Sequence, residues 1–397
     1  MHAETLAERI GETGDGRIRT LIIGGGIAGL TLGCLLRQRG ERPHIVEREA
    51  GFGQAGYSLG LYPLGSSVLH GLGLFDQLRQ TAVPMRFYEL GNGAGKVLRH
   101  FDFAPIADRY GPILGLRRAE LLEILRQGLG DLPIYFGETI SALARDERHV
   151  TVKFGDGSSA TFDLVVGADG IHSATRPIIL SAAECTSWDM GWACWITWAD
   201  GKIIPPETAA EFWGTGFLAG IYPVKGGQSV IVAGPRRILE RDGRIGFTEK
   251  VRHHLRDSGG PVRAVLEALT KDENPFLWDL QDCRCARWID KRVVLLGDAA
   301  AGFLPTAGVG ASMAMLGASV LAEELSRADP NHLDRALRLF YLRMRPKTDA
   351  AQASSRKLAR MMAVESGALA WGREQLMRFY PADRALSDIA KIMEGPI

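Results

Sequence analysis

Three glycines near the N-terminus have the spacing of a nucleotide-binding turn. Gly24, Gly26 and Gly29 follow a short apolar run at 19–23 and precede an apolar helical segment. The first glycine permits a tight turn, the second lets the backbone approach a pyrophosphate, and the third allows close packing of strand against helix. The free N–H groups at the start of such a helix hold phosphates. We therefore expect a phosphate-binding turn between a strand and a helix.

An acid lies at the distance that such a turn requires. Glu47 ends a second strand-like run at 43–46, which makes a βαβ unit with the first run and its helix. A carboxylate at this position is placed to accept hydrogen bonds from ribose hydroxyls. The unit predicts a dinucleotide site, although this fingerprint does not separate FAD from NAD(P). The alternative is a tight turn followed by a surface glutamate.

A second acid has an unusual position. Asp298 is the lone charge between Val293 and Ala322, directly after an apolar run and Gly297. A buried carboxylate needs hydrogen-bond donors, or it becomes neutral. We expect either that a ligand supplies hydroxyl donors or that Asp298 caps a helix beginning near Ala311.

The segments that position these residues show two different patterns of hydrophobic residues. Apolar runs at 164–167 and 293–296 are typical of strands buried on both faces of a sheet. Between about 177 and 285, tryptophans and other aromatic residues occupy alternating positions, which indicates a separate antiparallel sheet. Residues 331–368 and 373–394 have helical patterns, with moderately amphipathic faces that would cover the first unit or mediate a dimer.

Two later segments carry a resemblance to a known family. Asp163 to Arg176, which contains Asp169-Gly170, resembles the second motif of the FAD-dependent class A flavoprotein monooxygenases, the family of para-hydroxybenzoate hydroxylase. Arg292 to Ala300, followed by Pro305-x-x-Gly308-x-Gly310, resembles the third motif. The sequence departs from many relatives at Ala301, where they have His, and at 315–317, where they have Glu-Asp. These departures bear on the substrate.

The resemblance implies a fold and a domain organisation. The expected fold is α/β, with a Rossmann-like FAD-binding domain of the GR2 type, an inserted antiparallel-sheet substrate domain and C-terminal helices. The domains that we expect are an FAD-binding domain at 18–83, 104–176 and 286–330, a substrate-binding domain at 84–103 and 177–285, and C-terminal helices at 331–397.

The resemblance also implies the residues that contact the cofactor. Asp169 would lie near the pyrophosphate, Asp298 would contact the ribityl chain, and Arg118, with Arg117 as an equal candidate, would approach the phosphates or the ribityl. The loop from Pro305 would bring bare backbone against the isoalloxazine ring. The full predicted set is Gly24, Gly26, Ile27, Ala28, Gly29, Glu47, Arg48, Arg118, Asp169, Asp298, Pro305, Gly308, Val309, Gly310 and Ala311.

The activity that the resemblance implies is monooxygenation. NADPH or NADH would reduce FAD, O₂ would form a C4a-hydroperoxide, and one oxygen atom would pass to an aromatic or polycyclic molecule. Because the flavin does the chemistry, no protein nucleophile is required. The pocket candidates are Trp192, Trp213, Phe217, Tyr222 and Pro305. A general base is not assigned, with Tyr222, His70 and Arg86 as candidates.

Other activities remain open on this fold. A Baeyer–Villiger oxygenase, a flavin-dependent halogenase, an FAD oxidase or dehydrogenase and a non-catalytic FAD-fold subunit are the alternatives. The segment from Trp192 to Trp198 does not match the Trp-x-Trp-x-Ile-Pro pattern of halogenases, so that alternative is disfavoured.

Composition limits the partners. The chain has 397 residues with 47 Lys and Arg against 46 Asp and Glu, a formal charge of +1, and no basic block that would favour nucleic acid or an anionic membrane. The five cysteines form no CxxC pair, and the nine histidines have no metal-ligand spacing. We expect a cytoplasmic monomer or homodimer without a metal.

Overall fold

A computed structural model of the chain describes residues 4–11, 18–53, 56–255 and 260–394. Within it, the apolar runs of the sequence form a six-stranded sheet that is parallel except for β18, its edge strand. Every residue of β1, β12 and β19 is buried, which explains why these runs carry no polar alternation. In sheet order the strands are β18 (Ile289–Asp290), β19 (Val293–Leu295), β12 (Leu164–Gly167), β1 (Thr20–Ile23), β2 (His44–Glu47) and β8 (Ile134–Phe136).

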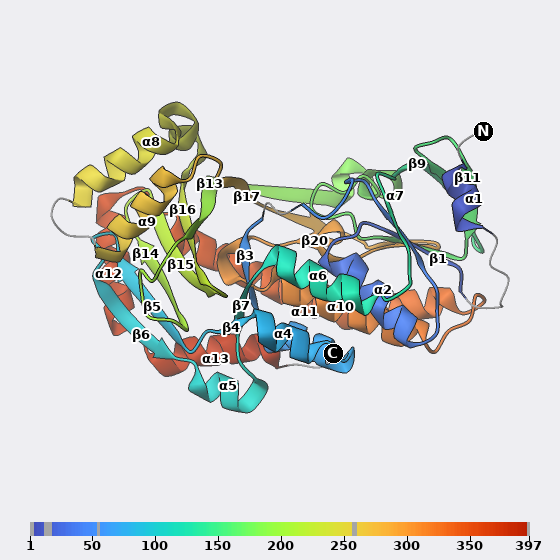
Figure 1. Cartoon of the computed structure of the whole chain (residues 1–397), viewed down its shortest axis with the longest axis horizontal. Helices are drawn as coiled ribbons and strands as arrows, with labels where there is room; N and C mark the ends of the chain where they lie inside the picture. The colour runs from blue at the N-terminus through green and yellow to red at the C-terminus, as the bar shows by residue number, and fades with distance from the viewer. Residues whose placement is uncertain (1–3, 12–17, 54–55, 256–259, 395–397) are drawn as a thin grey trace.

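A second sheet of eight strands lies towards the other end of the elongated molecule (Figure 1). Its neighbours are antiparallel except for β5 and β14, which are parallel because they come from two separate segments of the chain. In sheet order the strands are β20 (Ala301–Gly302), β17 (Phe276–Cys285), β13 (Cys185–Ala199), β16 (Gly227–Pro235), β15 (Leu218–Val224), β14 (Thr208–Trp213), β5 (Phe87–Asn92) and β6 (Val97–Asp102).

Two smaller sheets complete the strands. Strands β10 and β11, which flank Asp156, pair as a hairpin in a three-stranded sheet, and a second three-stranded sheet lies between the large sheets (Figure 1). Their strands are β11 (Ser159–Phe162), β10 (Val150–Phe154) and β9 (Ile140–Arg145), and β3 (Ser58–Leu61), β7 (Leu114–Arg117) and β4 (Val83–Pro84).

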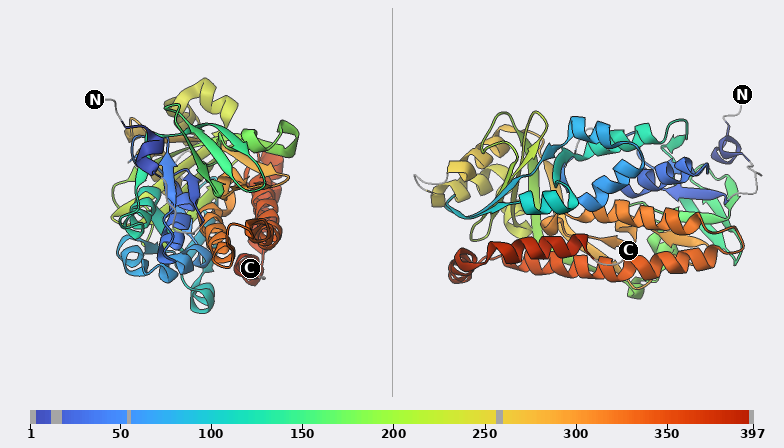
Figure 2. Two further views of the ribbon diagram at one scale, coloured as in Figure 1. Left: turned by 90° about the vertical axis from the view of Figure 1, so that its right-hand side faces the viewer. Right: turned by 90° about the horizontal axis from the view of Figure 1, so that it is seen from below.

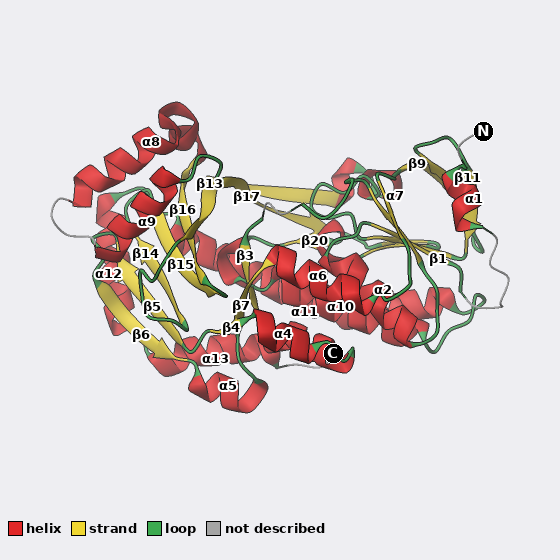
Figure 3. Ribbon diagram, viewed as in Figure 1, coloured by secondary structure: helices red, strands yellow, loops and turns green. Residues whose placement is uncertain are grey.

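Helices cover both sheets, as the colouring by secondary structure shows (Figure 3). Helices α2 and α10 pack on each other at the six-stranded sheet, while α8 and α9 pack on one face of the eight-stranded sheet. The helices are α1 (Leu6–Ile10), α2 (Ile27–Gln38), α3 (Pro63–Gly71), α4 (Phe75–Thr81), α5 (Ala104–Tyr110), α6 (Arg118–Gly128), α7 (Arg176–Ile179), α8 (Arg236–Leu255), α9 (Gly260–Lys271), α10 (Gly310–Leu325), α11 (Leu333–Met362), α12 (Gly367–Phe379) and α13 (Ala382–Met393), with the short 3₁₀ turns η1 (Ala182–Glu184), η2 (Gly297–Ala299) and η3 (Pro305–Ala307).

Long elements connect the two ends of the molecule. The 15-residue strand β13 and its partner β17 extend from the eight-stranded sheet towards the six-stranded one, and the 30-residue helix α11 runs along most of the length (Figure 2). A helix of this size is about 45 Å long. Residues 395–397 of the predicted C-terminal segment lie outside the described part of the chain.

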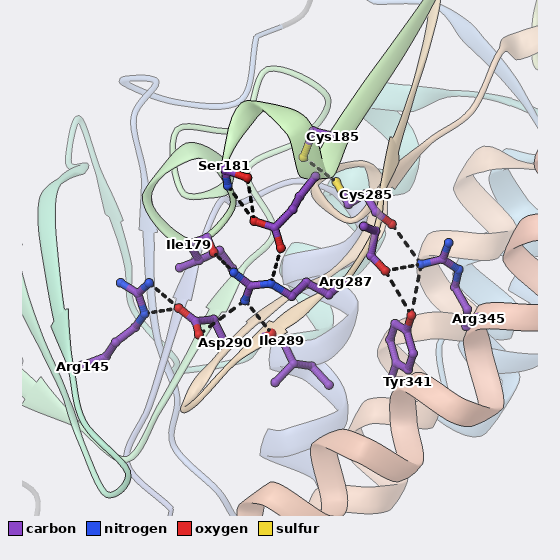
Figure 4. A network of polar contacts seen from close by, with 12 residues as sticks. Arg145, Ile179, Ser181, Cys185, Cys285, Arg287, Ile289, Asp290, Tyr341 and Arg345 are labelled. Carbon is purple, nitrogen blue, oxygen red and sulfur yellow. Dashed lines mark hydrogen bonds and ion pairs between the residues drawn. The ribbon is translucent and has the colours of Figure 1, made fainter.

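Arg287 and Arg345 hold in place the elements that connect the two large sheets (Figure 4). Arg287 donates to the Glu184 carboxylate at 2.6 Å and to the Ile179 carbonyl at 2.7 Å. Arg345 of α11 donates to the Cys285 carbonyl at 2.9 Å. Cys185 lies opposite Cys285 in the β13–β17 register, with 3.3 Å between the Sγ atoms of these free thiols. Backbone carbonyls and a carboxylate thus anchor β17 to α11 and to the segment before β13.

The described residues contain no cluster of His, Cys, Asp or Glu suited to a metal ion. Among their helices, none is both long enough and apolar enough to cross a membrane.

Candidate active site

A cavity of about 1100 Å³ lies between the two large sheets. Its lining begins at the N-terminus of α2, with Gly26, Ile27 and Ala28, and continues along one face of the eight-stranded sheet. Helices α11, α12 and α13 close another side, through residues such as Met362 and Met377. The cavity therefore joins the predicted nucleotide turn to the predicted substrate sheet.

The glycine turn has the geometry that the sequence predicts. Gly24 has φ +111°, and a Cβ there would lie 2.4 Å from the Ala168 carbonyl oxygen, so a larger residue would collide with backbone. A Cβ at Gly29 would lie 2.0 Å from the Gly24 oxygen. Helix α2 has no side-chain cap at Gly26, which leaves its first N–H groups facing the cavity. This end can bind an anion through backbone alone.

Glu47 lies beside the turn and holds its shape. One carboxylate oxygen accepts a hydrogen bond from the Gly25 N–H at 2.7 Å, and the other accepts from the Glu49 N–H at 3.0 Å. Arg48 pairs with Glu49 at 3.4 Å. Neither Glu47 nor Arg48 is part of the cavity lining, so both stand at the rim of the turn.

The Asp298 carboxylate opens into the cavity without a donor. Among the residues that the structure describes, none donates a hydrogen bond to it. Burial raises its pKa to about 6, against the opposing effects of the Arg176 and Arg118 charges. Asp298 does not cap α10, whose N-cap is Val309, so the helix-cap alternative is wrong. A carboxylate that is shielded from water and has no hydrogen-bond donor in the protein needs hydroxyl or N–H donors from a ligand.

Two neighbouring arginines have different directions. Arg118 lines the cavity, with its guanidinium 5.9 Å from the Tyr57 ring. Arg117 lies over Trp198 at 4.6 Å and is not part of the lining. The structure therefore separates the two candidates that the sequence left equal, and it brings Arg118 to the cavity.

Arg176 joins two sequence motifs that are far apart in the chain. Its guanidinium donates to the carbonyls of Asp298 and Ala299 at 2.9 Å each, and to those of Gly170 and Ile171 at 3.3 and 2.9 Å. No role for Arg176 follows from the sequence alone, although this residue ends the Asp169 motif. It is a positioning residue that fixes the backbone on which Asp298 is carried.

Asp169 has a local role in this structure. Its Oδ2 accepts hydrogen bonds from the Thr175 N–H at 2.9 Å and from the Thr175 hydroxyl at 3.0 Å, while its Oδ1 is buried without a partner among the described residues. The next residue, Gly170, has φ +77° and lines the cavity. Asp169 thus shapes the turn that presents Gly170.

The loop before α10 forms the wall opposite the eight-stranded sheet. Pro305, Gly308, Gly310 and Ala311 line the cavity, whereas Val309 is buried at 1% exposure and is not part of the lining. Gly308 has φ +64°, a conformation that side chains disfavour. Phe303, Leu304, Pro305 and Thr306 of the same loop also line the cavity, and the contact of this loop with a planar ring stays a prediction.

The aromatic candidates divide between the two faces of the eight-stranded sheet. Trp192, Trp213 and Tyr222 line the cavity. Phe217 lies instead in the core between the sheet and helices α8 and α9, together with Trp195. The structure therefore removes Phe217 from the group of pocket residues. His70 and Arg86, named as candidate bases, are not part of the lining.

A buried acid that the sequence analysis missed lies among these aromatic residues. Glu211, in the middle of β14, is 7% exposed and lines the cavity. Its carboxylate accepts hydrogen bonds from the Tyr222 hydroxyl at 2.6 Å and the Trp213 indole N–H at 2.8 Å. Burial raises the pKa of Glu211, and the hydrogen bonds from Tyr222 and Trp213 oppose that rise. Its signal in the sequence is that it is the single charge of β14.

Comparison with known proteins identifies this arrangement. A family model described as "FAD binding domain" matches residues 17–345. The chain is 31% identical over 379 residues to 3-amino-4-hydroxybenzoate 2-monooxygenase of Streptomyces cremeus, with 92% of both chains covered. The chain belongs to the flavin-dependent monooxygenase family.

Solved structures agree with this fold. Klebsiella pneumoniae HpxO, complexed with FAD and uric acid, matches with a TM-score of 0.86 at 24% identity, covering 95% of this chain and 96% of that one. Pseudomonas aeruginosa PqsL, in complex with 2-aminobenzoylacetate, matches with a TM-score of 0.77 at 25% identity, covering 90% and 99%. The predicted family, fold class and enzyme class are confirmed.

The residues of the monooxygenase fit FAD. The Asp298 carboxylate without a donor suits the hydroxyls of a ribityl chain, and the uncapped start of α2 suits a pyrophosphate. Between them, Arg118 adds a positive charge on the cavity wall. FAD binding by this chain thus has a physical basis in its own side chains and backbone.

Proposed function

We propose that this monooxygenase uses NADH or NADPH and O₂ to insert one oxygen atom into an aromatic or polycyclic small molecule. The observation that carries the proposal is the single cavity that joins the Asp298 end to a wall of aromatic side chains. Aromatic rings stack on planar substrates and exclude water from them. The Streptomyces relative is named for an aminohydroxybenzoate, and the Klebsiella structure contains uric acid.

The chain's own residues have separate tasks in this proposal. The N–H groups at the start of α2 would hold the phosphates, Asp298 would accept hydrogen bonds from the ribityl hydroxyls, and Arg118 would offset negative charge. When bound, FAD supplies the chemistry that passes electrons from the nicotinamide to O₂ and delivers oxygen. We assign Gly24, Gly26, Ile27, Ala28, Gly29, Glu47, Arg48, Arg118, Asp169, Asp298, Pro305, Gly308, Val309, Gly310 and Ala311 to the cofactor.

The substrate would lie between the loop and the sheet. Pro305 and the Gly308 backbone form one side, and Trp192, Trp213 and Tyr222 form the other. Apolar walls there would keep water from the reacting centre. We propose that the nicotinamide binds transiently and that the enzyme acts as a cytoplasmic monomer or homodimer on small molecules, with no nucleic acid or membrane partner.

The test is a turnover experiment with the purified, FAD-loaded enzyme. Aromatic and bicyclic compounds, including 3-amino-4-hydroxybenzoate, are screened for stimulated NADH or NADPH oxidation in ¹⁸O₂. Products are then analysed by mass spectrometry. The expected result is a product that gains one ¹⁸O atom. Stimulated oxidation that yields only hydrogen peroxide with every compound, or turnover without a nicotinamide, would contradict the proposal.

A further inference from the structure

The Glu211 carboxylate determines the direction in which the neighbouring hydrogen-bond donors point their hydrogens. A carboxylate only accepts hydrogen bonds, and each tyrosine hydroxyl has one hydrogen to give. Tyr222 gives its hydrogen to one oxygen of Glu211 at 2.6 Å. Trp213 gives its N–H to the other oxygen at 2.8 Å. Both donors are therefore committed to Glu211.

Because these donors are used by Glu211, the groups that face the cavity here can accept hydrogen bonds but cannot donate them. Tyr222 lines the cavity, where its hydroxyl oxygen retains a lone pair but has no free hydrogen. The Trp213 indole has no lone pair to offer. Arg373 lies over the Trp213 ring at 5.7 Å, but it donates to the backbone carbonyls of Met361, Met362, Trp213 and Gly214. Arg99 lies two strands away by register, about 10 Å, because it pairs with Leu90, which pairs with Glu211. This part of the wall is thus built to accept hydrogen bonds.

Because this part of the wall is buried, its hydrogen-bond acceptors discriminate between ligands that donate a hydrogen bond and ligands that do not. Glu211 is 7% exposed, and the surrounding wall is formed by apolar residues such as Leu218 and Ile231. In such a site, a polar group left without a partner after binding loses its hydrogen bond to water and gains nothing in return. A site made for a hydrogen-bonding substrate rejects the analogue that lacks the bond more strongly than an apolar site rejects a change of size.

We propose that Glu211, acting through Tyr222, selects aromatic substrates that present an O–H or N–H donor to this wall and rejects those that offer only an acceptor. This inference rests on the proposed function, because it names the class of aromatic molecule that the cavity takes. Glu211 is a positioning residue here: it does not touch the substrate, but it orients the Tyr222 hydroxyl that does.

Glu211→Gln offers a test that a merely structural role would not pass. The Trp213 N–H can only donate, so it requires the amide oxygen of the new side chain on its side. The NH₂ group then faces Tyr222 and donates to its oxygen, and the Tyr222 hydrogen turns into the cavity. The substitution keeps the size of the side chain while changing Tyr222 from an acceptor into a donor.

The experiment measures binding to the FAD-loaded enzyme without any nicotinamide. The probes are 2-naphthol, which donates and accepts, and 2-methoxynaphthalene, which only accepts. Dissociation constants come from the perturbation of flavin absorbance and, independently, from quenching of tryptophan fluorescence. For the wild type we expect 2-naphthol to bind about 10-fold more tightly, and for Glu211→Gln we expect the preference to reverse.

Two further variants complete the design. Glu324→Gln is the matched control, because Glu324 is a 4% exposed glutamate that pairs with Arg343 away from the cavity, and it should keep the wild-type preference. Tyr222→Phe should reduce the preference towards equal binding without reversing it. This second variant decides the question if Glu211→Gln does not load FAD.

Each other outcome overturns the inference. It fails if the wild type binds both probes equally or binds neither, or if Glu211→Gln keeps the wild-type preference. Because the measurement involves no turnover, these results are distinct from a failure of the proposed function. That failure would appear as absent ¹⁸O incorporation even while the binding preference is as expected.

Discussion

Asp298 and Glu211 are carboxylates that face one cavity, Glu211 buried and Asp298 half-buried, and their surroundings are opposite. Asp298 accepts no hydrogen bond from the described residues, whereas Glu211 accepts from a tyrosine and a tryptophan. Burial raises the pKa of both groups, to about 6 for Asp298. The same residue type therefore has two functions, which are distinguished by the donors around it.

The difference shows how one cavity separates the cofactor from the substrate. A carboxylate without donors is destabilised until a ligand supplies them, so Asp298 gains most when the site is filled. A saturated carboxylate gains nothing directly from a ligand, but it orders the groups that meet one. The Asp298 end is thus suited to tight binding and the Glu211 end to discrimination.

The largest expected effect is on FAD affinity and follows from removing the Asp298 carboxylate. Asp298→Ala should weaken FAD binding by about 100-fold, or about 2.7 kcal/mol, because hydrogen bonds from ligand hydroxyls to a charged group are lost. Titration by flavin fluorescence measures the change. Asp131→Ala, at an exposed acid paired with Arg42, is the control and should bind FAD as the wild type does. Unchanged affinity for Asp298→Ala would remove this residue from the cofactor site.

The next effect concerns stability at the other end. Glu211→Leu should lower the free energy of unfolding by about 2–3 kcal/mol, because the Tyr222 and Trp213 donors lose their buried acceptor. FAD affinity should stay close to that of the wild type. Urea denaturation of the apoprotein and flavin titration measure the two quantities. If FAD affinity fell as far as it does for Asp298→Ala, the two carboxylates would not have the separate roles described above.

A pH experiment sharpens the comparison further. The Asp298 carboxyl has a folded-state pKa near 6, above its ordinary value of 3.8, so the folded apoprotein binds more protons between those values. Its contribution to stability is therefore greatest at low pH and is lost as the pH rises from about 4 to 6, by an amount on the order of 2 kcal/mol.

The matched variant isolates this contribution. The difference in unfolding free energy between Asp298→Asn and wild-type apoprotein should grow in favour of the variant over the same pH window. FAD affinity of the wild type should fall below pH 6, because the protonated carboxyl is a poorer acceptor. A difference that does not change with pH would show that this carboxyl is not perturbed by burial.

The smallest expected effect concerns a single donor. Trp213→Phe removes the indole N–H from Glu211 while Tyr222 keeps its acceptor. We expect a loss of about 1 kcal/mol in the free energy of unfolding, measured by urea denaturation. A loss as large as that of Glu211→Leu would mean that Trp213 contributes mainly by packing.

Much of the cofactor end could be predicted from sequence because its signals are local. Gly29 is required by the backbone of Gly24, and the spacing of the motif records that contact, whereas Gly24 is required by the Ala168 carbonyl of a distant segment. Asp298 stood out as a lone charge in an apolar stretch. Arg176 did not, since its four carbonyl acceptors come from two segments that only the folded chain brings together.

The substrate end was predicted less well because strand residues alternate between faces. Trp192 and Trp195 are three positions apart on one strand and therefore point to opposite sides of the sheet. The sequence shows the alternation but does not show which side α8 and α9 cover, so it does not separate Phe217 from the cavity residues. Glu211 has a weaker signal than Asp298, because Glu207 lies four residues before it, whereas Asp298 is the lone charge between Val293 and Ala322.

Helix α11 gives the two ends a common reference. Gln352 donates to the carbonyls of Cys283 in β17 and Gly302 in β20, at 2.9 and 2.7 Å. Three residues further on, the Ser355 carbonyl accepts a hydrogen bond from Thr306, in the loop that faces the cavity, at 2.8 Å. Helix α11 thereby sets the distance between the flavin that activates oxygen and the substrate that receives it. A substitution that loosens these hydrogen bonds should divert electrons from the nicotinamide to hydrogen peroxide, while FAD and substrate still bind.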